Sequence, residues 1–522
     1  MFRDKLRSET FTYILYAVFI ACLFLFVKGY QFNTDDQAEH LPQVYQLMDH
    51  SLYQHDYFVR EYHKTYSLRS FYVWMVYGLS FIAPVSAICF ALTLLFISLS
   101  VYSFIRITTH FTKNKFAIFL SPLLIYIVFY KYTLGGNNIE CSSFICSTIS
   151  LSLAAFGLLQ FFREKYYLMA MLIGIGTLFQ VMDAFQPFFL LFLFMMTQYK
   201  KIGFKTLLIT LLIYIVFAGA MLIPMIYHQF FIHSVYDVAY FSDIIFLFRN
   251  PNHFLPSKFP ISDFYGFSAL AIIGFIIFVT KIRSHHRWFV IFTFWIIGLY
   301  CVLYYIGLEG MHQYWLGKTQ WFKSTMWVNA FASMFIAIGL SEIIFKNINT
   351  EKIFKYGRVL SSFGIIVLLF VILNSAMIPV AKFQGRYMVG NYKKSDLTMM
   401  HEWIATNTDK DKTILTFPSD FSFACEAKRS MPIGYKAIIH EPYFMIPWYE
   451  RYKEIYGASL ENIVNSDVLT VSDSLYTALF YSPVHPPIKI DYRLDDVSKC
   501  KYVGALGKEI HKEGNYLLTE FQ

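Results

Sequence analysis

The run Thr34-Asp35-Asp36-Gln37-Ala38-Glu39-His40 contains the residue types best suited to chemistry in this chain. Three carboxylates and one imidazole fall within six residues, directly after the first long apolar segment. Charged groups are costly beside a bilayer, so a cluster of them there is a candidate functional site. A carboxylate at a membrane surface can act as general base towards an acceptor hydroxyl, with a pKa that partial desolvation raises. We therefore predict Asp35 or Asp36 as the catalytic residue.

A helix would bring the polar side chains of this run to one face. The relevant positions, i, i+3, i+4 and i+7, are occupied by Asp36, Glu39, His40 and Gln43. The opposite face would be apolar, with Leu41, Val44, Met48 and Leu52. The pattern predicts an amphipathic helix on the membrane surface, started by a capping box of Thr34 and Gln37.

Two further roles are open to this cluster. Glu39 and His40 could orient a substrate, or Asp36, Glu39 and His40 could together hold a divalent cation, Mg or Mn, that neutralises a phosphate. Catalysis ranks above metal binding because no second set of ligands occurs at a diagnostic spacing. The simplest alternative is a solvated helix face.

Other polar residues in the loops are candidates for substrate binding. His55 and Asp56, in the same loop, could act as acid and base or orient a substrate, although each alone is commonly a surface residue. Arg249 and His253 occur in a rigid loop that contains two prolines, where Arg249 could bind a phosphate through two hydrogen bonds. The alternative is an ordinary turn at the membrane edge.

Gln320 and Lys323 come just before a later apolar run and are also predicted to bind substrate. Lys323 could neutralise a lipid phosphate, or it could be an interfacial anchor beside aromatic residues. Gln180, Asp183 and Gln186 occur at a break between two short apolar runs. Polar groups at such a break often line a cavity, and a solvent-facing turn is the alternative.

The composition is that of a membrane protein. Of the 522 residues, 56% are hydrophobic and only 15% are charged, and the mean hydropathy is +0.45. The apolar residues form about eleven runs, two of them short: 11–29, 80–105, 116–131, 142–162, 167–182, 185–198, 204–226, 264–280, 288–306, 324–345 and 359–380. At ~20 residues per span, they predict a polytopic α-helical protein with about 11 transmembrane helices and a short paired hairpin.

The positions of the positive charges predict how the chain is oriented across the membrane. The net charge of +9 comes largely from Lys and Arg in short loops, and one orientation places all of these loops inside. This pattern explains the charge without nucleic acid as a partner. The loops 30–79, 227–263 and 307–323 and the tail from about 381 would then be outside. No phosphate-binding glycine loop occurs in the sequence, so we expect any chemistry to take place outside.

The tail from about residue 381 mixes charged, polar, Pro and Gly residues with short helical and strand-like patterns. This composition predicts a small α/β domain. A helix is expected near His401, and Thr413–Phe417 has the pattern of a buried strand ended by Pro418. We therefore divide the chain into residues 1–380, a transmembrane domain that includes the acidic loop 30–79, and residues 381–522, an extracytoplasmic C-terminal domain.

Taken together, these residues resemble the GT-C superfamily of integral-membrane glycosyltransferases, in an uncharacterised bacterial branch. The resemblance rests on the acidic motif Asp35-Asp36…Glu39-His40, the many spans with a short hairpin, and the hydrophilic tail. In the tail, the stretch from Trp403 to Pro418 and the later Arg429…Lys436 and Trp448–Tyr452 are similar to the family. The family implies a first-loop Asp as base or metal ligand, and basic residues, here Arg249 and Lys323, on a lipid phosphate. The acceptor motif of oligosaccharyltransferases, of Trp-Trp-Asp type, does not occur in this sequence.

The predicted function is inverting transfer of a sugar from a polyprenyl-phosphate carrier to an envelope glycan, lipid or protein acceptor. The reaction would occur among the membrane lipids on the outer side of the bacterial cytoplasmic membrane. The main alternative is a transporter or flippase of lipid-linked or small polar substrates. Such proteins usually contain inverted repeats, and the sequence shows no such symmetry.

Overall fold

The structure is a computed structural model that describes residues 2–34, 36–62, 64, 67–231, 236–343, 350–383, 385–463, 467–478, 490–500 and 507–521. The chain forms two compact units, each built from segments that are distant in sequence. The first, called here the membrane unit, comprises Met1–Tyr30, Cys89–Gln229 and Asn252–Asn391. The second, the loop–tail unit, comprises Gln31–Ile88, Phe230–Pro251 and Tyr392–Gln522.

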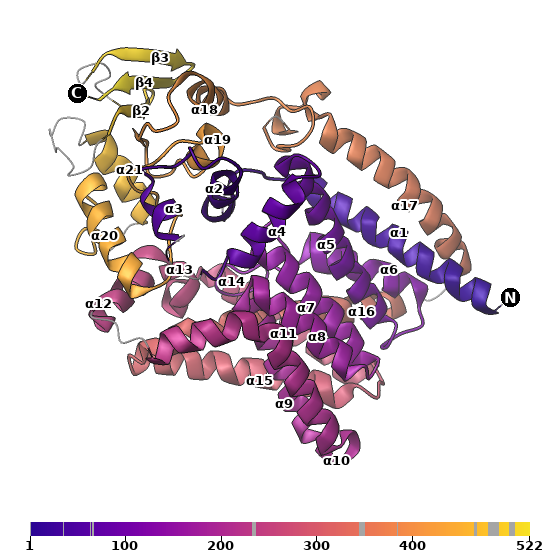
Figure 1. Cartoon of the computed structure of the whole chain (residues 1–522). Helices are drawn as coiled ribbons and strands as arrows, with labels where there is room; N and C mark the ends of the chain where they lie inside the picture. The colour runs from indigo at the N-terminus through magenta and orange to yellow at the C-terminus, as the bar shows by residue number, and fades with distance from the viewer. Residues whose placement is uncertain are drawn as a thin grey trace. The chain divides into compact units, whose positions relative to one another are not determined.

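Long apolar helices make up the membrane unit. The helices are α1 (Phe2–Lys28), α5 (Val85–Thr108), α6 (Lys115–Leu123), α7 (Cys146–Phe162), α8 (Tyr166–Phe179), α9 (Val181–Thr197), α10 (Tyr199–Ile202), α11 (Phe204–Phe231), α13 (Pro251–Phe254), α14 (Ile261–Lys281), α15 (Arg287–Tyr305), α16 (Thr325–Ile343) and α17 (Thr350–Leu373). Short π or 3₁₀ turns link them: η1 (Leu124–Val128), η3 (Pro256–Lys258), η4 (Ile306–Gly310), η5 (Tyr314–Thr319), η6 (Trp321–Ser324), η7 (Ser375–Met377) and η8 (Ala381–Phe383). Helix α1 and helix α17 lie side by side although they come from opposite ends of this unit (Figure 1).

The helix pattern confirms a polytopic membrane protein. Among the described residues, seven helices are long and apolar enough to cross a membrane, and four shorter apolar helices accompany them. Together they correspond one to one to the eleven apolar runs of the sequence. Two of the shorter helices, α8 and α9, pack on each other and on α7, as the predicted short hairpin requires. Helix α16 is the most enclosed of the long helices, with α6 and α14 packed against it.

The loop–tail unit is a mixed α/β structure. Its first two segments supply α2 (Gln37–Met48), α3 (Tyr57–Tyr62), α4 (Ser70–Ser80), α12 (Val238–Asp243) and η2 (Ile244–Arg249). The tail supplies α18 (Asp396–Asn407), β1 (Ile414–Leu415), α19 (Phe423–Ala427), α20 (Pro442–Tyr456), α21 (Val468–Ala478), β2 (Tyr492–Asp496), β3 (Glu509–Glu513) and β4 (Tyr516–Glu520). The strands form one sheet in the order β1-β2-β4-β3, with β1 parallel to β2 and the other pairs antiparallel. Strands β2, β4 and β3 are labelled in Figure 1.

From Gln37 to Tyr45, both faces of helix α2 are buried, contrary to the predicted amphipathic surface helix, and of its apolar residues Met48 is exposed. Helix α4 and the tail helix α19 pack against it, so its polar Glu39 and Gln43 are as enclosed as its apolar Leu41 and Val44. The helix begins at Gln37, whose side chain accepts a hydrogen bond from the Asn33 amide instead of forming the predicted capping box. A segment that we assigned to the transmembrane domain by sequence therefore groups with the tail.

Candidate functional site

The N-terminal turn of helix α2 carries the acidic cluster. Asp36 is the N-cap residue, and its Oδ1 lies 3.7 Å from Nζ of Lys436. Its side chain remains 44% exposed, so a substrate can reach the carboxylate. One turn later, Oε2 of buried Glu39 lies 3.8 Å from Nε of Arg69.

His40 lies inside the unit, behind the two carboxylates. Its side chain is only 1% exposed, and its ring centroid is 4.8 Å from that of Tyr72 on helix α4. Its Nδ1 contacts the backbone carbonyl of Asp36. A carbonyl can only accept, so Nδ1 donates the hydrogen bond and Nε2 of the neutral ring carries the lone pair.

Arg249 approaches the same cluster from the end of η2. The preceding Phe248 packs edge-on against the aromatic side chains of helix α20, with its ring centroid 4.9 Å from that of Tyr449. The guanidinium lies 4.3 Å over the ring of Tyr435, whose hydroxyl donates to the Arg249 carbonyl at 2.9 Å. These contacts attach the tail segment before α20 to η2, and that segment also carries Lys436.

The Arg249 side chain has unused hydrogen-bonding capacity. It is 6% exposed, and Nη1 donates to Oδ1 of Asn250 at 2.7 Å. Its Nε is buried and has no hydrogen-bond partner among the described residues. A buried donor without a partner is costly, and an anionic ligand is one way to satisfy it.

The charges around α2 give its titratable groups different states. Burial acts to raise the pKa of Asp36, as the sequence predicted, but the positive charge of Lys436 and of two nearby arginines outweighs it, so the pKa is lowered and not raised. Burial raises the pKa of Glu39 to about 7, and the charge of Arg69 opposes this rise. Burial, reinforced by Arg69, lowers the pKa of His40 to about 3. At neutral pH the cluster thus offers an ionised Asp36 and an uncharged imidazole.

The predicted metal ligands have other partners. Asp36 faces Lys436, Glu39 faces Arg69, and Nδ1 of His40 is used by a backbone carbonyl. Within the part of the chain that the structure describes, no three His, Cys, Asp or Glu side chains are arranged to hold a metal ion. A metal bound by Asp36, Glu39 and His40 stays a prediction.

The remaining residues predicted in the first loop have different surroundings. Asp35 lies outside the described residues. The carboxylate of Asp56 is buried and accepts backbone hydrogen bonds from Val59 and Met431, each at 3.0 Å. The bond from Met431 attaches the first loop to the tail. The His55 side chain is exposed, and its amide donates to Oγ of Ser430 at 3.2 Å.

The other predicted residues belong to the membrane unit. Lys323 forms an ion pair of 3.2 Å with Oδ1 of buried Asp183. Gln186 donates to the Gln320 carbonyl at 3.1 Å and accepts from Oγ of Ser324 at 2.8 Å. The break before α9 and the segment 319–324 therefore form one polar cluster. His253 is exposed, and its Nδ1 lies 2.9 Å from the Gly135 carbonyl.

A buried acid in the membrane unit was not predicted from sequence. Glu140 is 2% exposed, and Oγ of Ser152 lies 3.1 Å from its Oε1. The Ser152 hydroxyl donates to this carboxylate oxygen and shares its proton with the Phe96 carbonyl, which lies 2.7 Å away. Burial raises the pKa of Glu140 to about 8, although the Ser152 hydrogen bond opposes the rise.

Sequence reasoning missed two cations of the α2 cluster. Arg69 is a single basic residue before helix α4, and Lys436 lies about 400 positions after Asp36 in the sequence. Arg69 has no motif around it. Lys436 and Tyr435 belong to the stretch Arg429…Lys436 that is similar to the family, but nothing in that stretch predicts that Lys436 faces Asp36 or that Tyr435 stacks on Arg249.

Comparison with known proteins gives a family model for part of the tail and matches among solved structures. Residues 395–455 match the model of a domain of unknown function, DUF6798, and this segment contains Lys436. No curated protein sequence matches the chain. Among solved structures, the chain is similar to the oligosaccharyltransferase of Archaeoglobus fulgidus, crystallised with a tethered acceptor peptide containing the NVT sequon. The identity is 11% and the TM-score 0.44, over 94% of this chain and 69% of that chain. The function proposed for this protein rests on the geometry of the α2 cluster and not on this structural similarity.

Proposed function

We propose that this protein is a membrane glycosyltransferase of the GT-C type. It transfers a sugar from a polyprenyl-phosphate carrier to a hydroxyl of an envelope glycan, lipid or protein on the outer side of the cytoplasmic membrane. The observation that carries the proposal is Asp36, an accessible carboxylate that neighbouring cations keep ionised. An ionised carboxylate beside several cations suits a reaction in which a hydroxyl is deprotonated and a phosphate departs.

In the proposed reaction, Asp36 takes the proton from the acceptor hydroxyl. The acceptor oxygen then forms a bond to the anomeric carbon, with inversion, while the bond from that carbon to the phosphate oxygen breaks. The electron pair of the broken bond moves to the departing prenyl phosphate. The transition state therefore gains negative charge on the phosphate, where positive side chains stabilise it most.

Arg249 is the proposed phosphate ligand. Its Nε has no protein partner among the described residues, and the Tyr435 ring fixes the plane of its guanidinium. A planar guanidinium can donate two parallel hydrogen bonds to a phosphate. Lys436, 3.7 Å from Asp36, supplies a second positive charge. Glu39 and His40 would orient the sugar or the acceptor.

Asp36→Asn tests the proposal, because the amide keeps the shape of the carboxylate but cannot take a proton. We expect the transfer rate to fall by about 10²–10⁴-fold and the lipid-linked donor to accumulate. The measurements are the envelope glycan in cells and donor turnover by the purified protein. Asp35→Asn is assayed in parallel.

Asp49→Asn is the matched control, because Asp49 ends the same helix and its carboxylate is paired with Lys410 at 2.6 Å. It should retain normal transfer. Normal glycan in both the Asp35 and Asp36 variants, at normal protein levels, would contradict the catalytic proposal. Solute transport by the purified protein without any lipid-linked sugar would favour the transporter instead.

A further inference from the structure

Among the described residues, three cations from different helices of the membrane unit lie around the N-terminal part of helix α1. Arg106 belongs to the last turn of α5, Lys115 begins α6, and Arg358 belongs to α17. Helices α1, α6 and α17 pack on one another, and Figure 1 shows α17 alongside α1. Tyr13 of α1 is buried between two of the cations, with its ring centroid 5.7 Å from the Arg106 guanidinium and 5.5 Å from Nζ of Lys115. We call this group the α1 cluster.

The positive charge of the α1 cluster exceeds its negative charge. Nζ of Lys115 lies 3.2 Å from Oε1 of Glu9, and the two side chains are only 25% and 28% exposed. Arg358 donates to neutral oxygens, the Ser8 carbonyl at 3.1 Å and Oγ1 of Thr12 at 3.2 Å. The carboxylate of Glu9 therefore offsets one charge, and the other two cations have no carboxylate partner among the described residues.

Arg106 has the least satisfied side chain of the three. It is partly buried, and its Nε is inaccessible and has no hydrogen-bond partner among the described residues. The Tyr13 ring attracts the guanidinium but accepts none of its donors in a strong hydrogen bond. Leaving such donors unsatisfied is costly, and a phosphate matches the planar fork of a guanidinium. Arg249 of the loop–tail unit has the same unsatisfied Nε.

The α1 cluster belongs to the end of α1 that is remote from the first loop. From Tyr13 to its end at Lys28, α1 extends roughly 22 Å at a rise of about 1.5 Å per residue. This length is close to the ~30 Å thickness of the hydrocarbon core. Helices α1 and α5 are candidate membrane spans, and the basic loop between α5 and α6 is one of those predicted to be inside. The cluster is therefore expected at the headgroups of the inner leaflet, across the membrane from the proposed transfer.

We propose that Arg106 binds the phosphate group of an anionic ligand at this surface, with Lys115 and Arg358 supplying further positive charge. The same chemistry has two sources, the headgroup of an anionic phospholipid and free inorganic phosphate. Basic sites between spans on the cytoplasmic side are typical of headgroup binding. The rings of Tyr13 and Phe354, each within 6 Å of Nζ of Lys115, are of the type found at membrane interfaces. Such a ligand would join α5, α6 and α17 to the N-terminal part of α1, independently of sugar transfer.

The test uses the full chain purified in detergent and freed of lipid. Phosphatidylglycerol, phosphatidylcholine or inorganic phosphate is added, and native mass spectrometry and the thermal unfolding midpoint report binding. We expect phosphatidylglycerol to bind and to raise the midpoint well above the effect of phosphatidylcholine. Arg106→Gln should weaken phosphatidylglycerol binding about tenfold. It should not lower the midpoint of the lipid-free protein, because the charge that it removes has no carboxylate partner among the described residues. Arg106→Lys keeps the charge without the planar fork and should bind with intermediate affinity.

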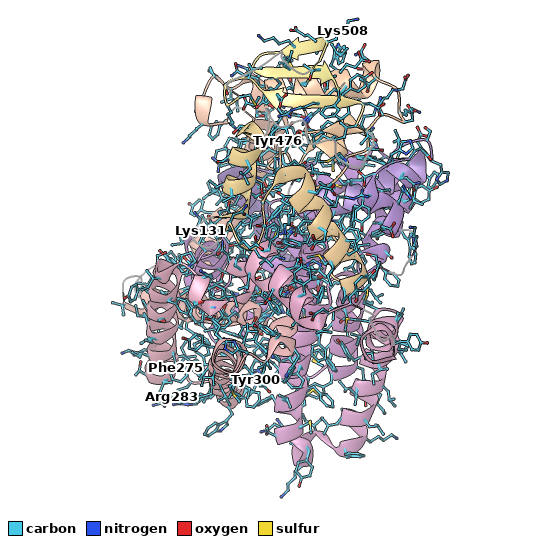
Figure 2. All side chains as sticks on the ribbon, turned by 90° about the vertical axis from the view of Figure 1, so that its left-hand side faces the viewer. Lys131, Phe275, Arg283, Tyr300, Tyr476 and Lys508 are labelled. Carbon is cyan, nitrogen blue, oxygen red and sulfur yellow. The ribbon has the colours of Figure 1, made fainter. Side chains whose placement is uncertain are left out.

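Arg283→Gln is the matched control. Arg283, labelled in Figure 2, is an exposed arginine of the loop between α14 and α15, another basic loop that is predicted to be inside. This variant removes the same charge and should bind phosphatidylglycerol as the wild type does. A rise in midpoint with inorganic phosphate alone, lost in Arg106→Gln, would support the site and identify the free anion as its ligand. Equal binding of phosphatidylcholine, equal losses in Arg106→Gln and Arg283→Gln, or wild-type binding by Arg106→Gln would each overturn the inference.

Discussion

At the scale of single residues, three carboxylates of one loop differ because of their partners. Asp36 is accessible and faces Lys436, which favours its ionised form. Glu39 is enclosed and faces Arg69, and burial brings its pKa to about 7. Asp56 accepts two backbone hydrogen bonds and attaches the loop to the tail. From residue type alone, all three would be expected to act as acids or bases in the same way.

The Glu39–Arg69 pair predicts a pH dependence of donor binding. Below pH 7, Glu39 is mainly protonated and does not offset the charge of Arg69, so the cluster is more positive towards an anionic donor. As the pH rises through about 7, Glu39 ionises and offsets that charge. We expect the KM for the donor to rise between pH 6 and pH 8, by up to about tenfold. Steady-state kinetics across this range measures it.

Glu39→Gln is the diagnostic variant for this pH dependence. The amide is neutral at every pH, so its KM should stay near the wild-type value at pH 6. If the variant shows the same rise in KM as the wild type, Glu39 is not the titrating group.

At the scale of elements, a buried histidine joins helix α18 to helix α19 and the segment before it. His401 is fully buried, with Nε2 3.0 Å from Oδ2 of Asp420 and Nδ1 2.9 Å from Oε2 of Glu426. Oγ1 of Thr416 also donates to Asp420 at 2.9 Å. Both ring nitrogens therefore face carboxylates, which is the arrangement of an imidazolium and not of a neutral ring.

This arrangement predicts that the loop–tail unit loses stability in alkaline solution. Burial alone would lower the pKa of His401, but Asp420 and Glu426 outweigh it and raise the pKa to about 9. A folded-state pKa above the unfolded value of 6.5 means that the stabilisation is complete below pH 6.5 and is lost as the pH rises through 9. The free energy involved is about 1.4 kcal/mol per unit of pKa shift.

The measurement is the thermal unfolding midpoint of the full chain in detergent from pH 6 to pH 10. His401→Asn should lower the midpoint at pH 6 and flatten its decline with pH. His50→Asn, at an exposed histidine of the first loop, should behave as wild type. A decline of unchanged slope in His401→Asn would assign the effect to another group.

At the scale of the whole molecule, the loop–tail unit collects residues from three separate parts of the sequence. The membrane orientation predicted from the basic loops requires all three parts to be on the same side of the membrane, which is consistent with a single folded unit. The orientation itself rests on the positive-inside rule, with the tail outside and the short basic loops inside.

Cysteine labelling with a membrane-impermeant reagent tests this orientation. A cysteine in place of Glu402 in the tail should react in intact cells. A cysteine in place of Lys201, in the loop after α9, should react only after the membrane is opened. Both positions are exposed, so access to the side chain does not limit either reaction. The reverse pattern would place the tail inside and remove the basis for an outer-face reaction.

The sequence alone determined the helical membrane architecture and the acidic cluster. Long apolar runs are a local property, because a span must satisfy its backbone within itself, and all eleven runs are helices. The charged residues beside the first run were equally visible from their types and spacing. Tertiary structure decided the environment of that cluster. Lys436 approaches Asp36 because tail segments pack on the first loop, whereas Arg69 approaches Glu39 because α4 folds back on α2 within that loop. Contacts between residues hundreds of positions apart leave no periodicity in one sequence, so only the folded chain could reveal them.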